Sequence, residues 1–222
     1  MPWDRPKLVR RDGPTVVLLH GLWRGLHAME PLARELRNDG FSTLNIPYPS
    51  MLQPIPRLAS SISELIASTV GNSPVHLVTH SLGGILARAM LAQDPSWSAR
   101  RIVMLCPPNR GSEIVDWSRK IPPLRAMLGP AGRSLGTHGA PLELPPIPTD
   151  VETAVIMGNH GTIPFFRKLL APENDGIVSV SSGRLNGLRG FSVIPADHTF
   201  IQMHPDAIRL TTRFLKTGEW PA

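Results

Sequence analysis

The chain of 222 residues contains one cysteine, Cys106, and no long hydrophobic run. A single cysteine excludes an intramolecular disulfide, so the sequence carries no sign of an oxidising compartment. No stretch approaches the roughly 18 consecutive apolar residues of a membrane-spanning helix. The segment from Met1 to Gly13 also lacks the apolar core of a signal peptide. We therefore expect a cytoplasmic protein without an integral membrane segment.

Lysine is scarce, because only 4 of the 23 basic residues are lysines and 19 are arginines, and the formal net charge is +6. A basic protein can bind an acidic partner such as nucleic acid or an anionic membrane surface, but the arginines are scattered and aromatic residues make up only 5% of the chain. Binding to a single strand needs cations interleaved with stacking aromatic side chains. The charge therefore predicts a basic solvated surface and no nucleic-acid partner.

Metal-binding patterns are absent as well. The chain has neither paired cysteines nor an H-E-x-x-H segment. His76 and His80 are four residues apart, but on a strand this spacing places them too far apart to share an ion. The sequence therefore predicts no metal site.

Short β-branched runs alternate with segments that carry apolar residues at helical spacing, which predicts a parallel sheet covered by helices on both faces. Strands are expected at Thr15–His20, Phe41–Ile46, Val75–Thr79, Arg101–Cys106, Thr153–Met157 and Phe191–Ile194. Helices are expected at His27–Asn38, Arg57–Val70, Leu82–Gln93, Ile163–Leu170 and Thr199–Leu215. The fold class is α/β, with a mostly parallel sheet of about six strands.

The β–α alternation is interrupted at about residues 107–148, where proline and glycine are frequent and only Ser112–Leu128 has a weak helical pattern. Long irregular segments inside compact domains are usually functional or mobile. We expect one domain over residues 1–222 with a lid- or cap-like insertion at about 107–148. A surface excursion without a role is the alternative.

Ser81 stands at the junction of an expected strand and an expected helix, in the segment His80–Gly84. A nucleophilic serine of this kind lies on a sharp strand–helix turn, and small residues two positions away on either side let the chain bend. Gly83 is one of these small residues, whereas Thr79 occupies the position where glycine is usual. The context predicts that Ser81 is a nucleophile.

The general base is expected beyond the carboxyl end of a strand, where catalytic groups of such sheets gather. His198 follows the last expected strand and directly precedes the closing helix. The other histidines after Ser81 fit less well, because they lie in the insertion, before the best acid or inside the closing helix (His138, His160 and His204). His198 is therefore the predicted base.

An acid must orient this imidazole and stabilise its charged form. Asp175 is favoured because it lies in the turn Asn174–Val178, which is followed by an apolar step. A turn aspartate without a catalytic role is the alternative. The remaining carboxylates end a helix, lie in the insertion, precede a strand or adjoin the base itself (Asp94, Asp116, Asp150 and Asp197).

Acyl transfer also needs two backbone amides that face the developing oxyanion. One should belong to Leu82, at the amino end of a helix whose dipole favours negative charge. The other should belong to Leu22, in the loop after the first strand, where Gly21 permits a close approach. We expect His20 to fix this loop, with a second general base as the alternative. Trp23 is expected to form a wall of the acyl pocket, with a packing role as the alternative.

These segments resemble the alpha/beta-hydrolase superfamily, and in particular its small bacterial lipases and esterases. The resemblance spans about Pro14 to Leu215 and rests on Leu18–Leu22, His80–Gly84, Asn174–Val178 and Asp197-His198. It implies an α/β-hydrolase fold and no cofactor. It also implies a catalytic triad of Ser81, His198 and Asp175, and an oxyanion hole from the amides of Leu22 and Leu82.

The expected reaction is hydrolysis of a carboxylic ester with a short-to-medium acyl group, through an acyl-enzyme. Apolar residues of the insertion would cover the acyl chain of a small-molecule or lipid substrate (Ile121, Leu124, Met127 and Leu128). One alternative is an acyltransferase that uses the same triad, and another is a non-catalytic binding protein on this fold. The sequence sets no oligomeric state.

Overall fold

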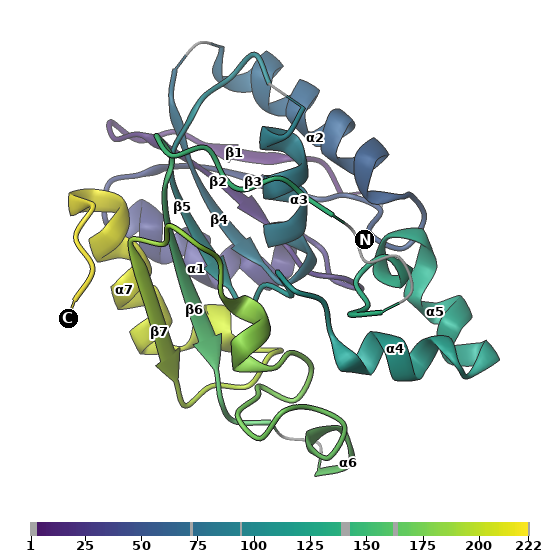
Figure 1. The fold of residues 1–222 in the computed structure, drawn as a ribbon. Helices are drawn as coiled ribbons and strands as arrows, with labels where there is room; N and C mark the ends of the chain where they lie inside the picture. Colours follow the sequence, from purple (N-terminus) through teal and green to yellow (C-terminus); the bar gives the residue numbers. More distant parts are fainter. Residues whose placement is uncertain (1–3, 72, 94, 139–142, 162–163, 222) are drawn as a thin grey trace.

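One seven-stranded sheet forms the centre of the computed structural model, which describes residues 4–71, 73–93, 95–138, 143–161 and 164–221 (Figure 1). The strand order is β1-β3-β2-β4-β5-β6-β7, and only the pairing of β1 with β3 is antiparallel. The strands are β1 (Lys7–Val9), β2 (Thr15–Leu19), β3 (Ser42–Ile46), β4 (Val75–His80), β5 (Ala99–Leu105), β6 (Glu152–Gly158) and β7 (Gly190–Ile194). All six expected strands are confirmed, and β1 adds a short antiparallel edge.

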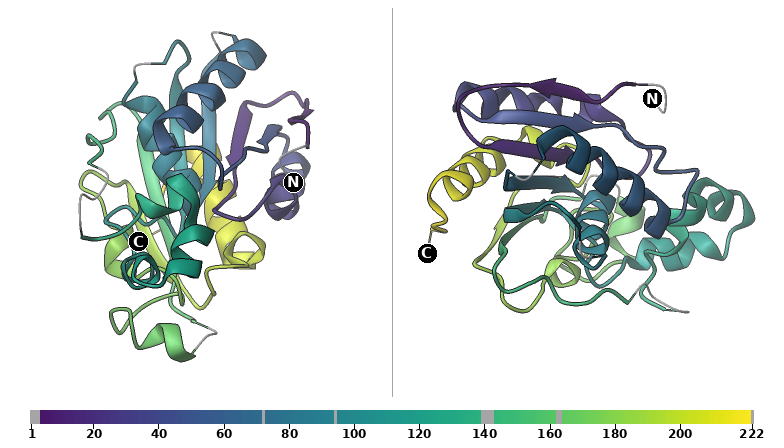
Figure 2. Two further views of the ribbon diagram at one scale, coloured as in Figure 1. Left: turned by 90° about the vertical axis from the view of Figure 1, so that its right-hand side faces the viewer. Right: turned by 90° about the horizontal axis from the view of Figure 1, so that it is seen from above.

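Helices cover both faces of the sheet, as the sequence predicts (Figure 2). On one face α2 (Ile55–Val70) and α3 (Leu82–Leu91) pack against the sheet. On the other face lie α1 (Leu26–Asn38) and α7 (Pro205–Thr217). Because the central strands are buried on both faces, they appear in the sequence as continuous apolar runs without polar alternation.

All five expected helices have different bounds in the structure. Two begin slightly earlier, α1 at Leu26 and α2 at Ile55, and the other three end early or are split. The closing helix is split into a 3₁₀ turn, η2 (Ile201–Met203), and α7, because Pro205 has no amide hydrogen and disfavours helical geometry at His204. The helix expected at Ile163–Leu170 is only α6 (Pro164–Arg167), and Ile163 itself lies outside the described residues. The third, α3, ends at Leu91 and does not extend to Gln93.

The insertion forms two helices, α4 (Glu113–Arg119) and α5 (Pro122–Arg133), in place of the single weak pattern. A second 3₁₀ turn, η1 (Val180–Gly183), precedes β7. Within the described residues no helix is long and apolar enough to cross a lipid bilayer.

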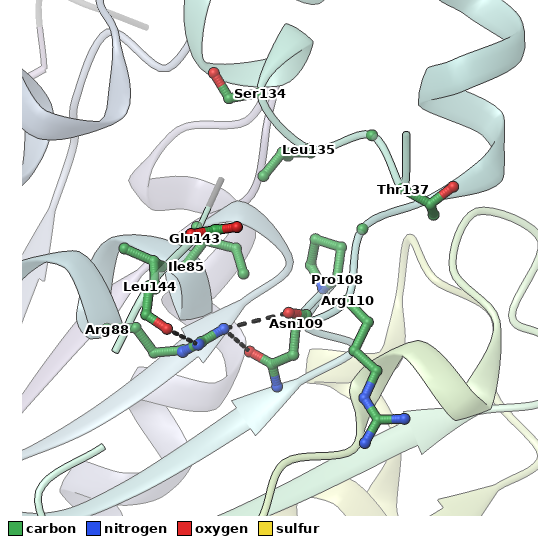
Figure 3. Close-up of a pocket in the computed structure, with 12 residues that line it drawn as sticks. Ile85, Arg88, Pro108, Asn109, Arg110, Ser134, Leu135, Thr137, Glu143 and Leu144 are labelled. Atoms are coloured by element: carbon green, nitrogen blue, oxygen red, sulfur yellow. Dashed lines mark hydrogen bonds between the residues drawn. The ribbon is translucent and has the colours of Figure 1, made fainter. Parts of the chain in front are cut away.

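Arg88 of α3 binds both ends of the insertion. It lines a hollow of about 240 Å³ together with residues from these two ends (Figure 3). Its guanidinium donates to the backbone oxygen and to Oδ1 of Asn109, at 3.3 Å and 3.4 Å, where the insertion begins. It also donates to the backbone oxygen of Leu144, at 3.1 Å, near the end of the insertion. One buried cation therefore holds the two ends of the insertion against the sheet-covering helix.

Two glycines let the first turn of α3 approach its neighbours closely. A Cβ atom on Gly83 would lie 2.6 Å from the backbone oxygen of Leu19, at the end of β2. A Cβ atom on Gly84 would lie 3.0 Å from the Pro107 side chain and 3.4 Å from Oγ1 of Thr79. Gly84 therefore leaves room for Thr79, the residue that departs from the usual small-residue pattern.

These contacts predict that the same substitution lowers the free energy of unfolding by different amounts at the two adjacent glycines. Gly83→Ala should lower the free energy of unfolding by about 2 kcal/mol, because the new methyl group meets rigid backbone. Gly84→Ala is the matched control and should cost less, because its nearest contact, Cβ of Pro107, is at 3.0 Å and not at the 2.6 Å found for Gly83. Urea unfolding of the two variants measures the difference, and equal costs would contradict the packing described.

Candidate active site

Ser81 lies in a strained turn between β4 and α3. Its backbone has φ 52° and ψ −119°, a region that residues with a side chain rarely adopt. The Ser81 amide donates to the backbone oxygen of Leu105 at 2.9 Å, which ties the turn to β5. The serine is 8% exposed and borders a cavity, so its hydroxyl is held at the carboxyl end of the sheet.

His198 and Asp175 meet Ser81 at this end of the sheet. Nε2 of His198 lies 3.0 Å from Oγ of Ser81, and Nδ1 of His198 lies 2.7 Å from Oδ2 of Asp175. The amide of His198 also donates to the backbone oxygen of Asp175 at 3.1 Å. The structure therefore brings the three residues predicted from the sequence into one continuous chain of hydrogen bonds.

Asp175 is held as an anion in a buried position. Burial opposes its ionisation, but the charge and hydrogen bond of His198 outweigh this effect and keep the pKa of Asp175 below its ordinary value. Its Oδ1 also accepts from the amides of Ile177 and Val178, at 2.9 Å and 2.7 Å. These contacts fix the carboxylate so that its second oxygen points to the imidazole.

The other acidic candidates lie elsewhere. Asp116 accepts hydrogen bonds from Thr137 and pairs with Arg119 inside the insertion. Asp197 accepts from the amides of the two residues that follow His198, and Asp150 is exposed. Asp94 lies outside the described residues. Of the described candidates, Asp175 is the one that bonds to His198.

The amides of Leu22 and Leu82 lie on the two segments that flank Ser81. Leu82 is the first residue of α3, and Leu22 follows β2 in the loop where a Cβ atom on Gly21 would lie 3.1 Å from Cβ of Ser81. Among the described residues neither amide has a backbone acceptor. Both donors are therefore available to a bound group.

His20 has the structural contacts expected of a residue that fixes this loop. Its Nδ1 donates to the backbone oxygen of Gly21 at 2.8 Å, and its Nε2 accepts from the amide of Tyr48 at 3.2 Å. The two rings stack with centroids 4.0 Å apart, and the Tyr48 hydroxyl donates to the His20 carbonyl. Burial lowers the pKa of His20 to about 4, so the ring is neutral.

His80 is a site residue that the sequence analysis missed. Its Nε2 donates to the backbone oxygen of His198 at 2.8 Å, and the two rings lie 5.0 Å apart. Burial lowers the pKa of His80 to about 3, with the charge of His198 as a second cause. A neutral His80 therefore holds the loop that carries His198. Its place directly before Ser81 was the only sequence signal.

An apolar cavity of about 450 Å³ opens beside Ser81 and His198. Trp23 lies in its wall, and the indole Nε1 donates to the backbone oxygen of Met127 at 2.7 Å. The insertion provides much of the remaining wall through Ile114, Val115, Trp117, Leu124, Leu128 and Leu135. Of the four insertion residues expected to cover an acyl chain, Leu124 and Leu128 line the cavity.

Cys106 is the third member of a group, with Asp175 and His198, whose possible ligand atoms lie within 4.8 Å of one another. Burial and the charge of Asp175 raise the pKa of the Cys106 thiol well above its ordinary value. The thiol is therefore protonated and lies beside the Asp175 carboxylate. Asp175 and His198 are bonded to each other, so the group is a buried cluster around the carboxylate.

Buried neutral histidines predict acid sensitivity. Burial lowers the pKa of His20 and of His76 to about 4, whereas an unfolded histidine titrates near pH 6.5. Between these values the unfolded chain binds more protons, so stability falls as the pH drops from about 6.5 toward about 4, by up to about 1.4 kcal/mol per pH unit for each group. Urea unfolding across this range should show this loss.

Single substitutions separate this effect from general acid denaturation. The variant His76→Gln should flatten the dependence of unfolding free energy on pH, because one lowered pKa is removed. The control is Ser60→Ala, on the exposed surface of α2, which removes no titratable group and should keep the slope of the unsubstituted chain. The same slope in all three proteins would contradict the assignment.

The profile of the "Alpha/beta hydrolase family" matches residues 16–172. Curated protein sequences give no match. Among solved structures, the propeptide form of lipase BlEst2 from Bacillus licheniformis has a TM-score of 0.74 at 20% identity, and the match covers 95% of this chain and 51% of that one. The chain thus spans about half the length of that form.

Two further matches cover most of this chain and most of the matched chain. The mature form of the same lipase has a TM-score of 0.71 at 18% identity, over 92% of this chain and 91% of that one. Carboxylesterase CesB from Bacillus subtilis has a TM-score of 0.59 at 14% identity, over 98% and 93%. At these identities the likeness shows a shared fold.

Proposed function

The chain belongs to the alpha/beta hydrolase family, and we propose that it is a serine esterase that hydrolyses carboxylic esters with short-to-medium acyl groups. The observation that carries this proposal is the Ser81–His198–Asp175 hydrogen-bond chain, with distances of 3.0 Å and 2.7 Å at a strained strand–helix turn. A non-catalytic protein on this fold would have no need of a strained serine in contact with a buried, oriented imidazole.

The proposed reaction has two steps. Because Nδ1 of His198 donates to Asp175, Nε2 is free to take the proton of the Ser81 hydroxyl while Oγ attacks the ester carbonyl. The C–O bond to the alcohol then breaks, and the alcohol leaves with the proton held by Nε2. Water attacks the acyl-enzyme in the same way, and the acid leaves as the Ser81 hydroxyl is restored.

The amides of Leu22 and Leu82 are the proposed oxyanion hole. Both flank Ser81, and Leu82 begins a helix whose dipole favours negative charge at this end. The apolar cavity would hold the acyl chain, with Trp23 as part of its wall and the insertion as its cap. The mechanism needs no cofactor, because each proton transfer is made by His198.

Removal of the hydroxyl tests the nucleophile. Ser81→Ala should lower kcat for p-nitrophenyl butyrate by about 10⁴-fold or more, because no acyl-enzyme can form. Near-ultraviolet circular dichroism should show an intact fold, since the substitution removes one oxygen. The matched control is Ser60→Ala, on the exposed surface of α2, which should retain full activity. Hydrolysis that survives in Ser81→Ala would overturn the proposal.

The cavity predicts a dependence on acyl length. For p-nitrophenyl esters, kcat/KM should rise about fourfold for each added methylene until the cavity is full, because each buried methylene contributes about 0.8 kcal/mol. Leu124→Trp narrows the cavity and should shift the optimum to shorter esters. Leu52→Trp, at a position exposed to 69%, is the control and should leave the profile unchanged. A flat profile would argue against an acyl pocket here.

A further inference from the structure

Large apolar side chains are exposed around the mouth of the cavity. More than half of the surface of each of four such residues is accessible: Trp23 (56%), Met127 (51%), Phe165 (54%) and Phe200 (58%). Each is connected to the cavity wall. Trp23 lines the cavity and bonds to Met127, the Phe165 ring packs 5.4 Å from that of the wall residue Trp117, and Phe200 directly follows the wall residue Thr199. The mouth therefore has an apolar rim.

A cationic hollow of about 360 Å³ is lined by residues of α4 and α5 and of the turn between them, in the insertion that also forms part of the cavity wall. Its lining carries four basic side chains and no acidic one: Arg119, Lys120, Arg125 and Arg133, with Pro122 and Ala126. Arg119 pairs with Asp116. Within the described part of the chain, the other three cations have no carboxylate within 4.0 Å. The hollow thus carries net positive charge.

Helix α5 joins the hollow to the rim. Leu124 and Leu128 line the cavity, Arg125 lines the hollow, and Met127 of the same helix is exposed. In Figure 1, α4, α5 and α6 lie together beyond the carboxyl ends of the strands. The sequence from Trp117 to Leu142 contains these four basic residues and no acidic residue. This run of sequence therefore carries only positive charge, and the acidic residues of the insertion, Glu113, Asp116 and Glu143, lie outside it.

We propose that this docking face, the hollow together with the rim, binds the surface of an anionic lipid assembly. Cations beside an exposed apolar rim match such a surface, because anionic headgroups attract the cations while the apolar side chains enter the headgroup region. A small soluble anion would use the hollow alone and would leave the rim without a role. The inference deepens the proposed function, since a docked molecule would face its cavity toward esters held in the lipid.

Vesicle sedimentation tests this interaction separately from catalysis. The full chain carrying Ser81→Ala is mixed with vesicles of phosphatidylcholine alone, or with one part in three of phosphatidylglycerol. We expect binding to the anionic vesicles only, weakened by added salt. Ser81→Ala does not hydrolyse esters, so its binding to vesicles is measured independently of catalysis. Absence of binding would therefore overturn the docking proposal and leave the esterase proposal standing.

Charge variants locate the face. In the Ser81→Ala background, Lys120→Gln with Arg125→Gln and Arg133→Gln should weaken partitioning about 100-fold, since each cation near an anionic surface contributes about fivefold. The matched control removes the same charge from the opposite end of the sheet, through Arg10→Gln, Arg11→Gln and Arg100→Gln. Equal weakening in both triple variants would mean that net charge alone acts, and would overturn the assignment.

The apolar rim has its own test. Met127→Gln with Phe200→Gln should weaken binding to anionic vesicles at least tenfold. The loss should persist at high salt, because the pair removes apolar side chains that enter the headgroup region and leaves the cations that attract the anionic lipid. Neither side chain lines the cavity, so hydrolysis of soluble p-nitrophenyl acetate by the same pair in the unsubstituted chain should be unchanged. Binding that is unaffected by this pair, or that inorganic phosphate displaces at constant ionic strength, would contradict docking on a lipid surface.

Discussion

The site depends on one backbone conformation, the left-handed turn at Ser81. Such a conformation costs about 1–3 kcal/mol, so the surrounding structure must impose it. The central strands and the first turn of α3 do so: the Ser81 amide bonds to the Leu105 carbonyl, and Gly83 lets the helix contact the end of β2. The result is a serine hydroxyl held where His198 can reach it, in a part of the chain that has little freedom to relax.

The rest of the site is arranged around this turn by loops that also carry the cavity. Ser112 donates to the carbonyl of Ile177 at 2.7 Å, and Ser179 donates to Glu113 at 2.9 Å, so the insertion is bonded to the loop that holds Asp175. His80 supports the His198 loop in the same manner. Movement of the insertion would therefore displace the loop that holds Asp175, which connects the cavity wall to the proposed acid.

Much of the fold could be predicted because strands buried on both faces leave continuous apolar runs in the sequence. The sequence pointed to Ser81 through its strand–helix junction, to His198 through its place after the last strand and to Asp175 through its turn at Asn174–Val178. The structure brings the three together, and their catalytic roles stay predictions. The prediction of one closing helix was wrong, because the apolar pattern continues across Pro205 whereas the helical backbone is interrupted just before it. The role of His80 could not be predicted, since it rests on a contact between a side chain and a carbonyl 118 residues away.

The most direct test of the central claim is the rate at which a fluorophosphonate modifies the protein, with the adduct located by peptide mass spectrometry. We predict one modified residue, Ser81, and modification slowed by about 10³-fold or more in Asp175→Asn, because the imidazole would lose its orienting carboxylate. Modification at another residue, or an equal rate in the Asp175→Asn variant, would contradict the claim that Ser81, His198 and Asp175 act as one unit.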